Sequence, residues 1–173
     1  AYFPFVRKAA AVQSIEDARR VGGPPLVRGG TAEGATGNDV AMVLRGLAAA
    51  SRTGLLAPDH AVVSGVVQLL QRLVAADGIF DACVSNHADV ELPNRWSTRR
   101  GAFLAKAAAG IIVSAQTLPG IPRSLVEVAD ATFDASLGWF VDQPHDDVHP
   151  LLYACEGVLS LPLHPGFASM LPA

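Results

Sequence analysis

Apolar residues recur at helical spacing along most of this chain. Over residues 58–76 the pattern is clearest, with apolar side chains at Val62, Val63, Val66, Val67, Leu70, Leu73 and Val74. Steps of three and four residues place them on one face of a helix. The many valines also suit a strand, but this long stretch contains no turn signal, so the pattern favours a helix that begins at Pro58.

The same spacing, interrupted by turn residues, predicts further helices. Asn38 or Asp39 can cap one start, Ser97 or Thr98 another, and Gly54 provides an end. Further predicted helices span residues 8–20, 39–53, 97–117, 123–141 and 150–160. A short strand is expected around residues 79–84.

One segment interrupts this pattern. Residues 21–38, "VGGPPLVRGGTAEGATGN", are rich in glycine, proline and threonine, which predicts a loop or linker. The chain is therefore predicted to divide into an N-terminal segment, 1–38, and a helical-hairpin domain, 39–173. The expected fold class is all-α, built from antiparallel helical hairpins.

Glycines recur inside the predicted helices. Arg45-Gly46-Leu47 aligns with Glu156-Gly157-Val158, and Gly110 is central in another helix. A glycine inside a helix costs ~1 kcal/mol relative to alanine, so its repetition indicates close helix–helix approach. Repeated hairpins of this kind are typical of helical arrays.

Two short segments resemble the (α/α) toroid families, which include carbohydrate-active epimerases, hydrolases and lyases. They are Asp77-Gly78-Ile79-Phe80, a "DG-x-F" turn, and "H-x-x-x-Y-x-x-E-G" from His149 to Gly157. A complete toroid has more helices than this chain, so the resemblance implies an arc or a fragment with a missing chain segment. It also implies that inner-helix N-termini and the connecting loops line a pocket.

Charge and cysteine content exclude several classes of protein. The formal net charge is −3, with 13 Lys and Arg against 16 Asp and Glu, so the basic footprint of a nucleic-acid-binding protein is missing. Cys83 and Cys155 are too few for a disulfide scaffold and are expected to be reduced and buried, which favours a cytoplasmic protein. The most apolar stretch, 102–121, is broken by polar residues and predicts no membrane span.

Candidate catalytic residues follow the "QPHDD" turn. His149, Tyr153 and Glu156 are spaced by four and seven residues, which places them on one helical face if His149 caps a helix that begins at Pro150. An imidazole, a phenol and a carboxylate can act in general acid–base catalysis. Alternatively, Glu156 pairs with an arginine across a helix interface and Tyr153 packs in the core.

Metal binding by His145, Asp147 and His149, with His164 nearby, is a second interpretation of the same region. The pattern is not H-E-x-x-H, and it spans a loop, so convergence of the ligands is not assured. Asp146 and Asp147 equally suit the positive N-terminal end of the following helix.

Arg95, Trp96 and Arg99 form a candidate substrate-binding set, because arginine can hold a carboxylate and tryptophan can stack on a sugar. The alternative is an exposed cationic stripe of Arg99 and Lys106, with Trp96 in the core. No nucleotide-binding loop is present, and no cofactor is expected.

These features favour a soluble enzyme, or enzyme fragment, that acts on a small polar substrate, most plausibly a carbohydrate. Acid–base chemistry of the isomerase or epimerase kind fits best, because no activated nucleophile is visible. The alternative is a non-catalytic helical module that binds a protein or peptide. A homo-oligomer that completes the helical arrangement is compatible with both.

Overall fold

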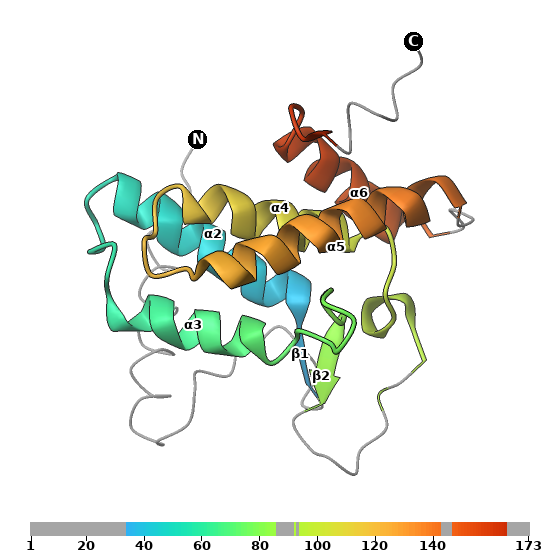
Figure 1. Cartoon of the computed structure of the whole chain (residues 1–173), viewed down its shortest axis with the longest axis horizontal. Coiled ribbons are helices and arrows are strands. Elements are labelled where there is room, and N and C mark those ends of the chain that lie inside the picture. Colours follow the sequence, from blue (N-terminus) through green and yellow to red (C-terminus); the bar gives the residue numbers. More distant parts are fainter. Residues whose placement is uncertain (1–33, 86–91, 93, 143–146, 166–173) are drawn as a thin grey trace, which may run out of the picture.

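The structure, a computed structural model, describes residues 34–85, 92, 94–142 and 147–165. This part of the chain is mostly helical, with a small two-stranded antiparallel sheet (Figure 1). Its helices are α2 (Gly37–Arg52), α3 (Ala61–Gln71), α4 (Leu104–Ala115), α5 (Arg123–Asp142) and α6 (Val148–Ser160). The strands are β1 (Gly34–Thr36) and β2 (Cys83–Ser85). The predicted helical character is confirmed.

Side-chain caps shift the starts of α2 and α3 away from the predicted positions. Thr36 caps α2, because its Oγ1 accepts a hydrogen bond from the Asp39 backbone N–H at 3.2 Å. His60 caps α3 through Nδ1, which accepts from the Val62 backbone N–H at 3.2 Å. Pro58 therefore lies before α3, and the prediction that it is the first helical residue is wrong.

Two further helix starts differ from the prediction. The helix predicted to begin at residue 97 begins at Leu104, and a 3₁₀ turn, Trp96–Thr98, precedes it. Thr98 Oγ1 closes that turn by donating to the Arg95 carbonyl at 2.9 Å. α6 begins at Val148 with Asp147 as its N-cap, so His149 lies inside the helix and is not its cap.

The small sheet was only partly predicted. β1 lies in the segment predicted as a loop and pairs with β2, with Ala35 opposite Val84. Most of the predicted strand at 79–84 is irregular, although Phe80 forms an isolated antiparallel bridge with Val74. Residues 34–38 therefore form β1 and the start of α2, while residues 1–33 lie outside the described part.

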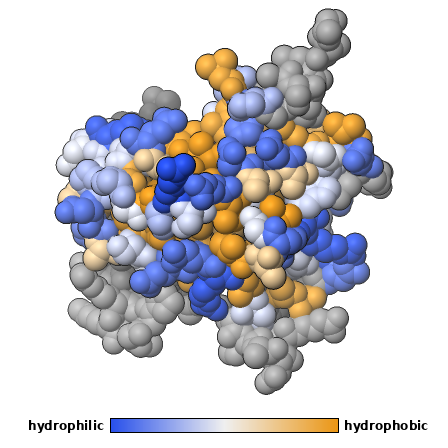
Figure 2. Space-filling model, in the orientation of Figure 1, coloured by the Kyte–Doolittle hydropathy of each residue, from blue (hydrophilic) through white to orange (hydrophobic). Residues whose placement is uncertain are grey.

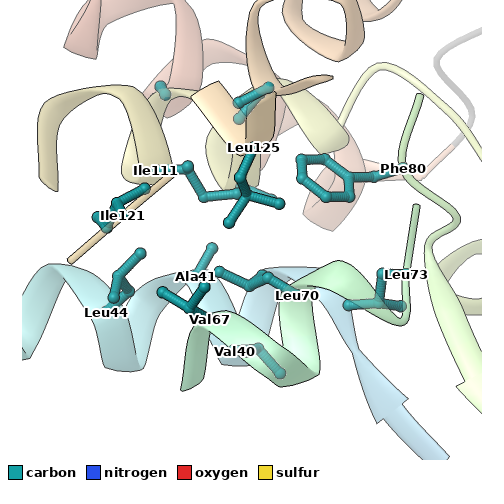
Figure 3. Close-up of a cluster of buried hydrophobic side chains, with 14 of the residues drawn as sticks. Val40, Ala41, Leu44, Val67, Leu70, Leu73, Phe80, Ile111, Ile121 and Leu125 are labelled. Atoms are coloured by element: carbon teal, nitrogen blue, oxygen red, sulfur yellow. The ribbon is translucent and has the colours of Figure 1, made fainter. Parts of the chain in front are cut away.

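Helix α4 is central and packs against α2, α5 and α6. α2, α4 and α6 run in one direction, and α3 and α5 run in the other (Figure 1). Side chains from α2, α3 and α4 meet those around the start of α5 in a buried apolar cluster (Figure 3). Its labelled members are Val40, Ala41, Leu44, Val67, Leu70, Leu73, Phe80, Ile111, Ile121 and Leu125. No helix in the described ranges is both long and apolar enough to cross a membrane.

Arg100 links the chain before α4 to the turn after α3. Its Nε donates to Asp81 Oδ1 at 2.9 Å, and its Nη2 donates to Asp77 Oδ1 at 3.1 Å. The Arg100 side chain is about three-quarters buried, whereas the side chains of Asp77 and Asp81 are each about half exposed. The "DG-x-F" turn is thus held by Arg100, one of the Arg99-Arg100 pair, although the sequence alone favours a solvent-exposed position for that pair.

This ion pair predicts a pH dependence of stability. The hydrogen bond from Arg100 lowers the pKa of the Asp77 carboxyl below its ordinary value of 3.8. A carboxyl whose pKa is lower in the folded state stabilises the fold above its unfolded pKa and loses that contribution as the pH falls through the folded value. We expect Asp77→Asn to lower the thermal midpoint at neutral pH, and this difference from wild type to disappear in acid.

Thermal unfolding of both proteins, followed by circular dichroism from neutral pH to below 3.8, measures this difference. Glu127→Gln is a control, because its partner Arg123 is almost fully exposed and such pairs contribute little. A difference between wild type and Asp77→Asn that stays constant at every pH would contradict the assignment.

Candidate functional site

Lys106 is the centre of a polar and aromatic cluster between α4 and α6. Its side chain is only 12 % exposed, and its Nζ lies 2.7 Å from Glu156 Oε2. The same ammonium lies 4.0 Å from the centroid of the Tyr153 ring, within the range of a cation–π interaction. The prediction that Lys106 belongs to an exposed cationic stripe is therefore wrong.

Glu156 connects three helices. In addition to its contact with Lys106, its Oε1 lies 3.5 Å from Arg45 Nη1 on α2. Its side chain is about half exposed, so the carboxylate is open to solvent while both cations hold it. The alternative that Glu156 pairs with an arginine across a helix interface is confirmed. Two cations and one carboxylate leave a net positive charge at this position.

Aromatic rings form one wall of the cluster. Trp96 contacts Tyr153 edge-to-face, with ring centroids 6.0 Å apart, and contacts Phe103 in the same manner at 5.2 Å. Trp96 and Tyr153 are partly buried and pack against a small core that includes Phe103 and Leu104. The interpretation of Trp96 and Tyr153 as packing residues thus holds, and each retains some exposed surface.

The predicted site residues are only partly brought together. Tyr153, Glu156 and Trp96 meet through Lys106. His149 is exposed on the first turn of α6, and among the described residues its side chain has no hydrogen-bond or ion-pair partner. Arg95 and Arg99 are also exposed, on either side of the 3₁₀ turn.

The alternative metal site falls partly outside the described residues, because His145 and Asp146 are not among them. Within the ranges that are described, no three His, Cys, Asp or Glu side chains are grouped as metal ligands. His164 instead contacts α5, where its Nε2 lies 2.8 Å from Asp130 Oδ1 and its Nδ1 lies 3.7 Å from Asp134 Oδ1.

The two cysteines lie on different elements, Cys83 on β2 and Cys155 on α6. Both are free and half-buried rather than fully buried. Burial raises the pKa of the Cys83 thiol, and a thiol is reactive only as its thiolate. The Cys83 thiol is therefore mostly protonated at neutral pH.

Arg45 and Lys106 were missed as members of the cluster, although one signal pointed to Arg45. The internal alignment places Arg45 opposite Glu156, one residue before the glycine in each helix. α2 and α6 both pack against α4, and these two residues carry opposite charges at equivalent positions, which favours an ion pair between them. No comparable signal marked Lys106, which is far from Glu156 in sequence.

Comparisons with protein-family models, with curated proteins and with solved structures found no match to this chain. The resemblance to (α/α) toroids therefore depends on the two short segments quoted above.

Proposed function

We propose that this chain is a carbohydrate-active helical domain, or part of one, that binds a small acidic sugar at the Lys106 cluster. The observation that carries the proposal is the nearly buried ammonium of Lys106, held between the Glu156 carboxylate and the Tyr153 ring. A lysine with so little exposure needs compensating partners, and the cluster supplies them beside partly exposed aromatic surface.

The helix directions support a toroid-like arc as part of this proposal. α2 and α6 each pack on α4 and run in the same direction as α4, whereas the intervening helices α3 and α5 run in the opposite direction (Figure 1). This alternation is what a short arc of an (α/α) toroid requires. The three charged residues of the cluster come one each from α2, α4 and α6, the inner helices of such an arc.

The proposed chemistry is proton transfer next to a sugar carboxylate, as in an isomerase or epimerase. Arg45 and Lys106 provide the positive charge that attracts the anion, and the exposed parts of the Trp96 and Tyr153 side chains contact the sugar ring. Glu156 removes a proton from a carbon of the substrate and returns it. His149, one turn before Tyr153, is the second proton-transfer group, and Arg95 or Arg99 adds an outer contact to the anion.

Solvent-deuterium exchange tests this proposal directly. Uronic acids and related sugar acids are first screened by thermal shift, because a ligand that binds only the folded state raises the midpoint. Those that bind are incubated with the protein in deuterated buffer and analysed by NMR. We expect Glu156→Gln to reduce exchange by about 10²-fold or more, the usual contribution of a general acid or base.

Two variants separate binding from chemistry. Lys106→Met should abolish the thermal shift, whereas Glu156→Gln should keep most of it while losing exchange. Glu127→Gln, a carboxylate on α5 away from the cluster, should change neither. No shift with any sugar acid, or exchange that survives Glu156→Gln, would refute the proposal.

A non-catalytic interaction module is the second candidate function. It is favoured by the exposed apolar side chains of α6, which an enzyme working alone would not need. If so, the role of the Lys106 cluster is to stabilise the packing of α6 on α4. In that case no sugar acid would shift the thermal midpoint of the wild type, and Lys106→Met and Glu156→Gln would change only the stability of the protein.

A further inference from the structure

The two cations of the Lys106 cluster hold the Glu156 carboxylate at different distances. Lys106 Nζ lies 2.7 Å from Glu156 Oε2, whereas Arg45 Nη1 lies 3.5 Å from Glu156 Oε1. A charge-assisted hydrogen bond between a cationic nitrogen and a carboxylate oxygen is usually about 2.7–2.9 Å long. Lys106 therefore makes the tight contact with Glu156, and Arg45 makes a loose one.

The same two side chains differ in their access to solvent. The Lys106 side chain is 12 % exposed, and its ammonium contacts both the Glu156 carboxylate and the Tyr153 ring. The Arg45 side chain is 34 % exposed, and Glu156 is its one ion-pair partner among the described residues. A guanidinium group has five N–H donors, so Glu156 leaves most of the donors of Arg45 unused.

The aliphatic part of Arg45 packs closely on α4. A Cβ at Gly110 would lie 3.1 Å from Cδ of Arg45 and 3.3 Å from its Cγ, so the glycine leaves the space that this side chain occupies. Gly110 is buried and follows Lys106 by about one helical turn, so the two residues lie on the same face of α4. The packed chain brings the guanidinium group to the Lys106 cluster and reduces the conformational entropy that it loses when it binds an anion.

The charge of the cluster matches a carboxylate better than a phosphate. Arg45 and Lys106 contribute two positive charges and Glu156 contributes one negative charge, which leaves one positive charge. A carboxylate carries one negative charge at neutral pH, whereas a phosphate monoester carries about 1.5 to 2. A phosphate would place its additional negative charge beside the Glu156 carboxylate, where charges of the same sign repel each other.

We propose that Arg45 is the specificity-determining residue of this site, whose guanidinium group binds the carboxylate of the ligand while Lys106 keeps Glu156 in place. This inference rests on the proposed function, because it assigns the anion of the sugar acid to one of the two cations. The planar guanidinium group can donate two parallel hydrogen bonds to a carboxylate, which an ammonium group cannot do. Lys106 is also required, because without it Glu156 would neutralise the charge of Arg45.

Isothermal titration calorimetry with glucuronate and galacturonate tests the proposal. Arg45→Lys keeps the positive charge but loses the paired hydrogen bonds, so we expect it to weaken binding of these acids by about 10-fold or more. The uncharged amides of both acids, and glucose 6-phosphate, should bind the wild type more weakly than the acids do. Arg123→Lys should bind like the wild type, because Arg123 is almost fully exposed on α5, which crosses the face with many hydrophilic side chains in Figure 2.

Circular dichroism first shows that the variants are folded, and Arg45→Gln replaces Arg45→Lys if the lysine variant is not. Binding of the acids that is unchanged by the substitution of Arg45 would overturn the inference and leave the proposed function standing. Tighter binding of glucose 6-phosphate than of either acid would also overturn it, because the site would then select phosphate. If the wild type bound neither acid, the proposed function would fail, and the role of Arg45 would fail with it.

Discussion

Gly157→Ala should lower the free energy of unfolding by about 3 kcal/mol, the upper part of the usual range for inserting a methyl group into a packed interior. A Cβ at position 157 would lie 2.3 Å from the carbonyl carbon of Ala105 and 2.4 Å from the backbone nitrogen of Lys106. These are backbone atoms of α4, which cannot rotate away as a side chain can. The added methyl group must therefore push α6 off α4.

Gly46→Ala is the matched control for this prediction. Gly46 lies inside α2 at the position equivalent to Gly157, and a Cβ there would meet no atom of the described residues within 4 Å. Alanine should then stabilise the helix by up to ~1 kcal/mol. Chemical denaturation followed by circular dichroism gives both values. If Gly157→Ala and Gly46→Ala changed the free energy of unfolding in the same direction and by the same amount, that result would contradict the close contact between α4 and α6.

Phe133→Ala should cost about 3–5 kcal/mol, as is usual when a fully buried phenylalanine is truncated. Phe133 is 0 % exposed on α5, and its ring lies 4.6 Å from the ring of His164, centroid to centroid. Its loss leaves a cavity and removes the support of His164, which reaches Asp130 from the end of the described chain. Because domains are stable by only about 5–15 kcal/mol, much of the protein should be unfolded at moderate temperature.

Differential scanning calorimetry or denaturant titration measures this loss. Val141→Ala on the same helix is the control, since its side chain is 67 % exposed and surface changes usually stay within ~0.5 kcal/mol. Phe133→Leu should fall between the two, because it fills part of the cavity. Equal stability of Phe133→Ala and Val141→Ala would show that Phe133 is not packed as described.

The sequence predicted the helices well and their starts poorly. The apolar spacing in α3 reflects burial of Val63, Val66, Val67 and Leu70, which is a property of the whole helix. The start of a helix depends on one side chain reaching one backbone N–H, and Thr36 and His60 were not distinguishable from their polar neighbours. β1 was missed because its three residues depend on pairing with β2, a distant segment.

In the candidate site, too, contacts within one helix were predictable from the sequence, whereas contacts between helices were not. Helical spacing predicted that Tyr153 and Glu156 share a face, and both do contact Lys106. That lysine was assigned to an exposed stripe because its burial depends on α6 covering the start of α4. No pattern within α4 alone contains that information.

The central position of α4 also determines how the chain can fold. α2 and α3 are neighbours in sequence and can pair through local contacts, whereas the α2–α4 and α4–α6 contacts join segments that have a whole helix between them in the sequence. Such contacts require loop closure before they stabilise anything, and they slow folding. We therefore expect the rate-limiting step in folding to be the packing of α4 against α2 and α6.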